Sequence, residues 1–465
     1  MGKTFRAYNL DQRLLLPPDM RQWLPEGHLA LFLLDVVSQL DLTEIVKVYE
    51  KGDGRGQPPY HPVMMVTLLL YAYCTGKPSS RRIERATYEE VAYRVMAGNQ
   101  HPDHDSIANF RQCHLQALAR LFVQVLQLCE AAGLVKLGHV ALDGTKVKAN
   151  ASKHKAMSYE RMCAKEKELE AEVARLLEQA QQVDAAEDAE YGKGRRGDEL
   201  PAELARRETR LQKIRAAKAA LEAEARATAE QAAAQAREKL AARVQQEAET
   251  GKKMGGRPPQ VPDPEQAQPA PTAQRNFTDP ESRIMKDGAT KGFEQAYNAQ
   301  AVVDRTAQII VAAAVTQEAN DKQQLQPMLE KVQENCGRLP EQASADAGYF
   351  NTEQLTDQRL SSVDLYVPPD RQKHGAAPET LAAATATDAS VADQMRQKLK
   401  TGAGQAVYKW RKAIVEPVFG QTKEARGFRR FSFRGLTKVA AEWNLIALTH
   451  NLLKLWRAQP RPLAA

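Results

Sequence analysis

The tract between residues 156 and 250 restricts the possible folds of the chain more than any other segment does. It is dominated by Ala, Glu, Lys, Arg and Gln and lacks the β-branched residues found on either side of it. This composition is typical of long helices. The segment YGKGRRGDELP (residues 191–201) breaks the tract, so we predict a helical hairpin with one arm before the break and one after it. A linker rich in Pro, Gly and Gln (residues 251–272) follows.

Apolar residues recur every seven positions on both arms of this hairpin, which predicts an apolar seam. Two uses fit such a seam: the hairpin packs on itself, or the seam serves as a dimer contact or a clamp on DNA. The seam residues are Met162, Leu169 and Leu176 in the first arm, and Leu204 with Leu211 and Ile214 with Leu221 in the second.

Two short apolar segments, one on each side of the hairpin, lead to aspartates. Residues 137–142 predict a buried strand that ends at Asp143, and a second segment ends at Asp346. A third acid, Glu416, lies in a pattern of helical period. Because carboxylates at the ends of neighbouring parallel strands share one edge of a sheet, we expect Asp143 and Asp346 to lie close together, with Glu416 approaching from a covering helix.

Further elements separate the two aspartates. Residues 296–303 and 308–315 predict two strands joined by a turn, and residues 363–367 predict another strand after Asp346. A helix is expected over residues 322–335, with Asn320 and Asp321 as its N-terminal caps. This order of strands, helices and acids predicts an α/β fold with a ribonuclease-H-like mixed sheet and flanking helices.

The three acids suggest a metal site. Carboxylate oxygens are the ligands that magnesium requires, and two magnesium ions held by such residues stabilise the attacking and leaving oxygens in phosphoryl transfer. Lys423 follows Glu416 by seven residues. In a regular α-helix this spacing places both side chains on one face, where the ammonium can contact a phosphate.

Residues 1–135 predict helices at 62–73, 80–96 and 105–132, the last ended by Gly133. The start of the last helix suggests a recognition helix, with Asn109, Arg111 and His114 as candidate DNA contacts. The alternative is a helical bundle that only packs and dimerises.

The charge of the chain, +7 with a pI near 9.0, is unevenly distributed. Its last 70 residues are strongly basic, and phenylalanines interleave with the arginines there, which indicates contact with nucleic acid. The arginines concerned are Arg426, Arg429, Arg430 and Arg434, and the phenylalanines are Phe428, Phe431 and Phe433.

Two classes of protein are not indicated by the sequence. No apolar run reaches the roughly 20 residues needed to span a bilayer, and the first residues lack the apolar core of a signal peptide, so a cytoplasmic location is expected. The five cysteines are scattered and show no CxxC spacing, so neither a disulfide framework nor a zinc site is expected.

Several sequence blocks together resemble the DDE transposases of bacterial insertion sequences, in the branch with a Tyr, Arg, Glu, Lys signature around the last acid. The signature residues here are Tyr408, Arg411, Glu416 and Lys423, with one residue more between Arg and Glu than is usual. The blocks are HPVMMVTLLLYAYCTG, PDHDSIANFRQCH, DGTKVKANAS, YNAQAVVD, ADAGYF and VEPVFGQTK.

This resemblance implies that Asp143, Asp346 and Glu416 bind two Mg²⁺ ions, for which Mn²⁺ substitutes. It implies that Tyr408, Arg411 and Lys423 contact the DNA end, and that the partners are terminal inverted repeats, target DNA and further copies of the chain in a homodimer or larger synaptic assembly. The expected reaction is nicking of the ends and joining of their 3′ ends to target DNA. Alternatives are a nuclease of the same fold or an inactive, transposase-derived DNA-binding protein.

The expected domains are a helical DNA-binding or dimerisation domain (residues 1–135), a catalytic domain (136–155 with 272–465) and the inserted hairpin with its linker (156–271).

Overall fold

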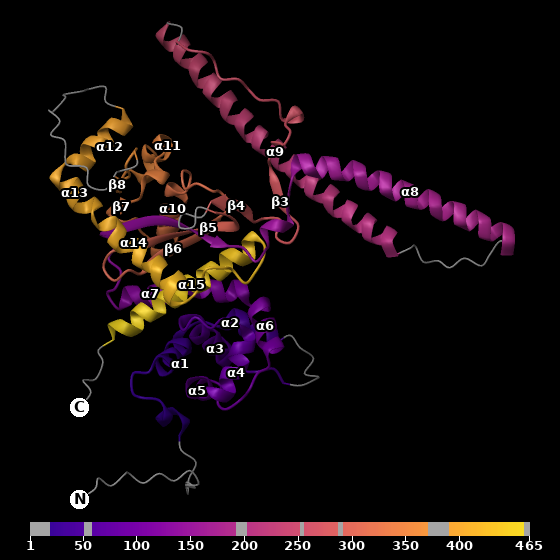
Figure 1. The fold of residues 1–465 in the computed structure, drawn as a ribbon. Coiled ribbons are helices and arrows are strands. Elements are labelled where there is room, and N and C mark those ends of the chain that lie inside the picture. Colours follow the sequence, from indigo (N-terminus) through magenta and orange to yellow (C-terminus); the bar gives the residue numbers. More distant parts are fainter. Residues whose placement is uncertain are drawn as a thin grey trace, which may run out of the picture. The chain divides into compact units, whose positions relative to one another are not determined.

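The structure is a computed structural model that describes residues 19–50, 58–191, 202–251, 255–286, 292–370 and 390–459. The described residues form two compact units (Figure 1). The first unit contains the residues up to Val147 and from Asn298 onward, and the second contains residues 148–297. Helices and strands occur in both units, so the α/β class predicted from the sequence is confirmed. None of the described helices combines the length and the apolar character that crossing a membrane requires.

The first unit is built on a mixed sheet. Its strands follow the order β5-β1-β7-β8, with β6 also paired to β5. The pairs β1–β7 and β7–β8 are parallel, and β5–β6 is antiparallel. The strands are β1 (His139–Lys148), β5 (Phe293–Asp304), β6 (Ile310–Thr316), β7 (Gln342–Ser344) and β8 (Asp364–Tyr366).

The predicted strands at 296–303, 308–315 and 363–367 are confirmed by β5, β6 and β8. The predicted end of the first strand is wrong, since β1 does not stop at Asp143 but continues to Lys148. Thr145 and Val147 are β-branched, and Val147 is buried, so the residues after Gly144 retain the character of a strand.

The N-terminal helices follow the prediction except at two breaks. The expected helix over 80–96 is divided at Glu90, and the one over 105–132 is divided at His114, whose buried ring bonds to the Tyr49 hydroxyl at 3.0 Å. Gly133 has a φ of +73°, which confirms it as the left-handed residue after the last helix. The helices are α1 (Leu29–Gln39), α2 (Thr43–Glu50), α3 (Pro62–Cys74), α4 (Ser80–Glu89), α5 (Val91–Met96), α6 (His104–Cys113) and α7 (Leu115–Ala131).

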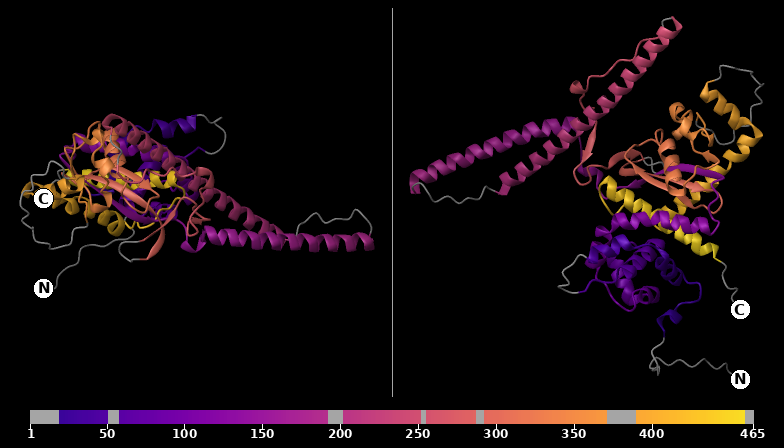
Figure 2. Two further views of the ribbon diagram at one scale, coloured as in Figure 1. Left: turned by 90° about the horizontal axis from the view of Figure 1, so that it is seen from above. Right: turned by 180° about the vertical axis from the view of Figure 1, so that it is seen from behind.

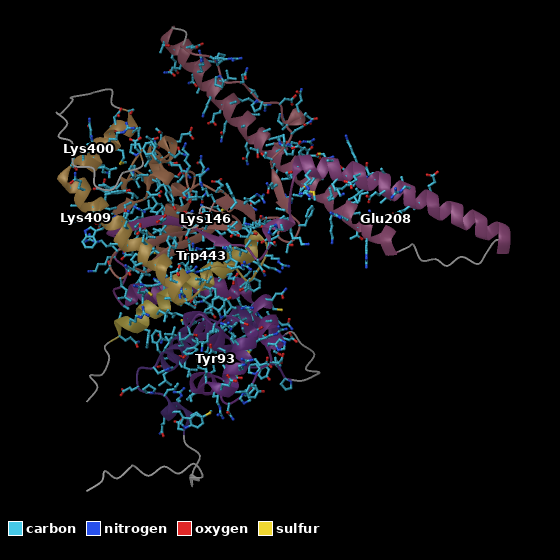
Figure 3. All side chains as sticks on the ribbon, in the orientation of Figure 1. Tyr93, Lys146, Glu208, Lys400, Lys409 and Trp443 are labelled. Carbon is cyan, nitrogen blue, oxygen red and sulfur yellow. The ribbon has the colours of Figure 1, made fainter. Side chains whose placement is uncertain are left out.

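A long C-terminal helix, α15 (Leu436–Ala458), forms the centre of the first unit and is buried along most of its length. It lies beside α7 and packs on α3 and β6 (Figure 2). Trp443, labelled in Figure 3, is buried and donates from its indole nitrogen to the Gln300 carbonyl at 2.9 Å. The remaining helices of this unit are α10 (Leu325–Cys336), α11 (Thr352–Leu355), α12 (Val391–Lys400), α13 (Gly402–Tyr408) and α14 (Trp410–Gly420), with short 3-10 helices at Met20–Trp23, Ala347–Tyr349 and Gln358–Leu360.

Asn451 of α15 satisfies both backbone groups of Ile310 at the start of β6. Its Oδ1 accepts from the Ile310 nitrogen at 2.8 Å, and its Nδ2 donates to the Ile310 carbonyl at 2.8 Å. We expect Asn451→Ala to lower the free energy of unfolding by about 2–6 kcal/mol, because two buried backbone groups would be left without partners at about 1–3 kcal/mol each. Chemical denaturation would measure the change. A loss below about 1 kcal/mol, the net value of one ordinary hydrogen bond, would contradict this account.

The second unit contains the predicted helical hairpin, which is confirmed. Its arms are α8 (Tyr159–Tyr191) and α9 (Ala202–Thr250), which lie side by side near Tyr159 (Figure 1). At their base, the short strands β2 (Ala156–Ser158) and β3 (Gln274–Asn276) pair antiparallel, and β4 (Arg283–Lys286) pairs antiparallel with the first residues of β5. Short 3-10 helices lie at Lys153–Lys155 and Pro264–Gln266.

The heptad residues form the apolar core between the two arms. Met162, Leu169, Leu211, Ile214 and Leu221 are buried together there. Leu176 is half-buried, and the side chain of Leu204 lies outside the described residues. The interpretation that the hairpin packs on itself therefore accounts for the seam.

Candidate active site

Asp143 lies on β1, and Asp346 lies at the equivalent position two residues after the end of the neighbouring parallel strand β7, which stops at Ser344 rather than at Asp346. The pairing of β1 with β7 aligns Ala141 with Ser344, so each aspartate lies two residues beyond an aligned pair. Side chains two residues apart point to the same face of a sheet. Asp346 also caps the short helix Ala347–Tyr349 by accepting from the Gly348 nitrogen at 2.9 Å.

Asp143 lies in an environment that disfavours its ionised form. The pKa of Asp143 is raised to about 7: burial is the main cause, Arg411 opposes the shift, and the neighbouring carboxylates of Asp346 and Asp321 contribute to it. Such a carboxyl group is only partly ionised near neutral pH. A cation bound beside it would favour the ionised form.

Arg411 connects Asp143 to Glu416. It is buried in α14, where its Nη1 lies 3.5 Å from Asp143 Oδ2 and its Nη2 lies 3.8 Å from Glu416 Oε1. Tyr408 lies beside this guanidinium; burial raises the pKa of its phenol, and Arg411 opposes that shift. The structure thus brings together Tyr408, Arg411, Glu416, Asp143 and Asp346.

The donor chemistry of these residues fits magnesium, because all three acids offer hard carboxylate oxygens. The three acids lie farther apart than the ligands of a complete metal site. Among the residues that the structure describes, no three His, Cys, Asp or Glu side chains are grouped closely enough to hold an ion. Glu416 instead pairs with Arg411, and 54% of its side chain is exposed.

Pro417 lies inside α14 rather than at its start. Because proline has no N–H, the carbonyl of Ala413 loses its helical partner. The side chain of Gln308 supplies a replacement and donates to this carbonyl at 2.9 Å. The helix therefore continues through Pro417, and Glu416 is held in a formed helix.

Lys423 does not follow the regular helical spacing predicted for it. After Gly420 the chain forms a π-helical turn, Gln421–Ala425, which changes the angle between Glu416 and Lys423. The Lys423 ammonium donates to the Lys146 carbonyl of β1 at 2.7 Å. The structure thus places Lys423 against the strand that carries Asp143.

A second group of polar residues at this site was not predicted from the sequence. The prediction that Asp321 caps a helix is wrong, because α10 begins only at Leu325. Asp321 Oδ1 instead accepts from Asn298 Nδ2 and Gln300 Nε2, both at 2.6 Å, and lies 3.9 Å from Lys146 Nζ. Lys146, labelled on the sheet in Figure 3, is mostly buried; burial lowers the pKa of its ammonium, and the nearby carboxylates oppose the shift.

Gly144 leaves room for Asp321. A Cβ on Gly144 would lie 2.4 Å from Gln300 Nε2 and 2.6 Å from Asp321 Oδ1, whereas one on Gly348 would lie 3.0 Å from Asp346 Oδ1. Both glycines belong to the segments that carry Asp143 and Asp346. A glycine follows each aspartate closely, and glycine often marks the close approach of another group. These glycines were the sequence signal that could have indicated further polar residues at the site.

We expect Gly144→Ala to lower the free energy of unfolding by about 1–3 kcal/mol, because the methyl group would displace Gln300 or Asp321 and break a buried hydrogen bond. Thermal denaturation would detect the loss. Gly420→Ala is the matched control, since a Cβ there meets nothing within 4 Å. Equal stability of the two variants would show that Gln300 and Asp321 can move aside for the methyl group without loss of stability.

Comparison with protein families gives two matches. A family model described as Transposase domain (DUF772) matches residues 18–113, and one described as Transposase DDE domain matches residues 372–456. Comparison with curated proteins and with solved structures finds no significant match. The second family match includes the Tyr408, Arg411, Glu416 and Lys423 signature.

The two matches support a DDE transposase of an insertion sequence. Asp143 and Asp346 lie outside both matched ranges. Their assignment to the site of the transposase therefore rests on strand register and, for Asp143, on its ion pair with Arg411, and it is part of the proposal below.

Several predicted DNA contacts of the transposase need correction. Arg426 is buried, donates to the Ile446 carbonyl and to Thr449 Oγ1, and has a pKa lowered to about 10 by burial. It stabilises the packing of α15 and is not available to a phosphate. Phe428 and Phe431 are also buried, Phe428 against Tyr73, so neither can stack on an exposed base.

The predicted recognition helix of the transposase is corrected in the same way. Arg111 donates to the Pro78 carbonyl at 2.6 Å and lies over the Phe433 ring, while His114 is buried. Asn109 is exposed and lines a hollow of about 700 Å³ between α2, α3 and α6. Of the three candidate base contacts, Asn109 alone remains accessible in the described structure.

Arg429, Arg430 and Arg434 are all exposed, and Arg429 pairs with Glu424. We expect the double substitution Arg430→Ala with Arg434→Ala to weaken binding to duplex DNA of any sequence. The slope of log affinity against log salt should flatten by about 0.9 for each phosphate that the variant no longer neutralises. Fluorescence anisotropy over a salt series would measure this, with Arg429→Ala as a control of smaller expected effect. An unchanged slope would mean that these arginines do not touch DNA.

Proposed function

We propose that this transposase binds the inverted ends of its element, nicks them and joins the 3′ ends to target DNA by magnesium-dependent phosphoryl transfer. The observation that carries the proposal is the placement of Asp143 and Asp346 two residues beyond an aligned pair of the adjacent parallel strands β1 and β7, with Arg411 between Asp143 and Glu416. The mixed sheet is consistent with a ribonuclease-H-like core, which is part of the proposal.

Asp143, Asp346 and Glu416 are the residues that would hold two magnesium ions, and manganese offers the same kind of oxygen-ligand chemistry. When bound, such ions lower the pKa of a hydroxyl or water and stabilise the charge on the leaving oxygen. The raised pKa of Asp143 supports this role, because a carboxylate without a sufficient counter-charge gains most from a bound cation.

The other residues of the site would orient the DNA. Arg411 holds the carboxylates of Asp143 and Glu416 at 3.5 Å and 3.8 Å, and the Tyr408 ring lies beside it. Lys423 and Lys146 are the cations on the β1 side of the site. Since guanidinium and ammonium groups both bind phosphate oxygens, these side chains are suited to hold a scissile phosphate in line for attack.

The proposed partners are terminal inverted repeats and target DNA, with two or more copies of the chain in the synaptic assembly, and the proposed location is the cytoplasm. A labelled duplex carrying one end of the element, mixed with supercoiled plasmid and Mg²⁺ or Mn²⁺, tests the reaction. We expect labelled 3′ ends joined covalently to the plasmid. Nicked duplex without joined product would favour the nuclease alternative, and binding without nicking would favour an inactive DNA-binding protein.

A further inference from the structure

A cavity of about 460 Å³ lies in the second unit, at the base of the helical hairpin. Its walls come from the first turn of α8, from α9 and from the segment just before α8. Figure 3 marks Glu208 on α9, near the α9 residues that line this cavity. All of its lining residues fall within residues 148–297, so the cavity belongs to this unit alone.

The cavity is lined by five basic residues: His154, Lys155, Arg161, Arg210 and Lys213. No aspartate or glutamate lines it among the residues that the structure describes. Each of the five side chains belongs to an exposed residue, and no ion pair joins any of them to an acid within the described part of the chain. Like charges gathered in this way repel one another.

Nearby cations of the same hairpin are arranged differently. Arg215 lies 3.2 Å and Lys218 lies 2.8 Å from the carboxylate of Glu166, and Arg275 lies 2.6 Å from Glu224. Glutamates are therefore present on both helices, but they pair with residues outside the cavity. The cavity cations are therefore available to an anionic group of another molecule.

The cavity also offers apolar surface. Met157, Ile214 and Phe277 line it, and Ile214 belongs to the core between the arms. A ligand that satisfies both kinds of surface carries anionic oxygens and less polar rings or sugars. Arginine is well suited to such a ligand because its planar fork of donors matches the oxygens of a phosphate.

We infer that this cavity binds the sugar-phosphate backbone of DNA, with phosphates on the arginines and lysines and deoxyribose on the apolar residues. The inference rests on the proposed function, since it takes DNA as the substrate. The inference assigns the hairpin a second role besides packing on itself, namely contact with DNA. This contact is made by the base of the hairpin and not by its heptad seam.

The test compares two triple variants of the full chain. The cavity variant is Arg161→Gln, Arg210→Gln and Lys213→Gln. The control variant is Lys167→Gln, Arg206→Gln and Arg226→Gln, which removes the same charge from exposed positions of the same helices outside the cavity. Neither variant removes a buried side chain. The cavity variant should unfold at the same temperature as the wild type or a higher one, because it loses like-charge repulsion.

Binding to a duplex is measured over a salt series for the wild type and both variants. For the cavity variant we expect affinity to fall at least tenfold at low salt. The salt slope should flatten by about 0.9 for each phosphate that is no longer neutralised, so by about 2.7 if all three side chains bind phosphates. The control should change much less. Equal losses of affinity in the two variants would overturn the inference, because overall charge would then explain the effect.

Two further outcomes are distinguishable. If the wild type failed to bind any duplex, the proposed function would fail together with the inference. If the wild type bound DNA and the cavity variant bound it equally well, only the inference would fail. A parallel titration with inorganic phosphate should give a larger thermal shift for the wild type than for the cavity variant, because the cavity cations bind phosphate oxygens. A shift confined to the wild type, without a difference in DNA binding, would overturn the inference and assign the cavity to a small phosphate compound instead.

Discussion

Replacing Asp143 or Asp346 by Asn, or Glu416 by Gln, should abolish nicking and strand transfer while DNA binding is retained. Each substitution removes a negatively charged oxygen ligand at nearly constant shape. We expect the rate to fall by more than about 100-fold, because even residues that only support metal ligands contribute about 10- to 100-fold. Rates on labelled end duplexes in Mg²⁺ would be compared with anisotropy on the same duplexes.

Glu424→Gln is the matched control, since Glu424 follows the same helix, is exposed and pairs with Arg429. It should retain wild-type rates. A variant of Asp143, Asp346 or Glu416 with near wild-type cleavage would remove that residue from the proposed site. Since the three residues are proposed to act as one unit, a double variant should be hardly slower than the single ones.

Stability measurements separate this loss of activity from misfolding. The pKa of Asp143 is raised to about 7 in the folded protein, so the contribution of this carboxyl group to stability is present at low pH and is lost as the pH rises through about 7. In buffer with a chelator, Asp143→Asn should therefore be at least as stable as the wild type at pH 8. A marked loss of stability there would point to a structural role instead.

A fragment ending at residue 135 should fail to fold by itself. The helices α3 and α7 bury their faces on α15 and the residues before it. This is seen in the stacking of Tyr73 on Phe428, with ring centres 5.5 Å apart, and in the packing of Leu115 and Ala119 on Ala441. Domains are stable by only about 5–15 kcal/mol, so the loss of such a central helix exceeds what the remaining core can supply.

Circular dichroism and amide dispersion in NMR spectra would measure this, with the full chain as the reference. Adding a peptide that covers α15 and the preceding residues from Phe428 provides the control and should restore part of the helical signal. Cooperative unfolding of the isolated fragment would contradict the prediction. For the same reason, recognition of terminal repeats is better tested by Asn109→Ala in the full chain than by a separate N-terminal fragment.

Local sequence patterns were sufficient to predict most helices and strands, but they were insufficient to predict the tertiary contacts of individual side chains. The hairpin and its seam could be predicted because heptad spacing and composition act within one segment, as Met162 and Leu169 illustrate. The continuation of β1 was missed because an acid and a glycine interrupt its apolar pattern, although β-branched residues follow. The π-helical turn before Arg426 could not be predicted, because no repeating pattern of residues in the sequence indicates it.

The corrections at the site have a common physical cause. Whether an arginine contacts DNA or the protein depends on what packs beside it, and Arg426 and Arg111 face groups that are distant in sequence. Asp321 was predicted to be a helix cap because nothing in its neighbourhood indicates that Asn298 and Gln300 will donate to it. By contrast, the relation between Asp143 and Asp346 could be predicted, because the parallel register of β1 and β7 places both aspartates two residues beyond an aligned pair, although β1 continues past Asp143.

The position of α15 at the end of the described chain has a consequence for how the protein is made. The helices α3 and α7 leave the ribosome early, but the helix that covers their apolar faces begins only at Leu436. At about 5–20 residues per second, the early helices wait for a period on the order of tens of seconds before their packing partner exists. A transcript cut short before this helix therefore yields a polypeptide that cannot complete its fold, and the first unit can form only after the residues from Leu436 onward have been translated.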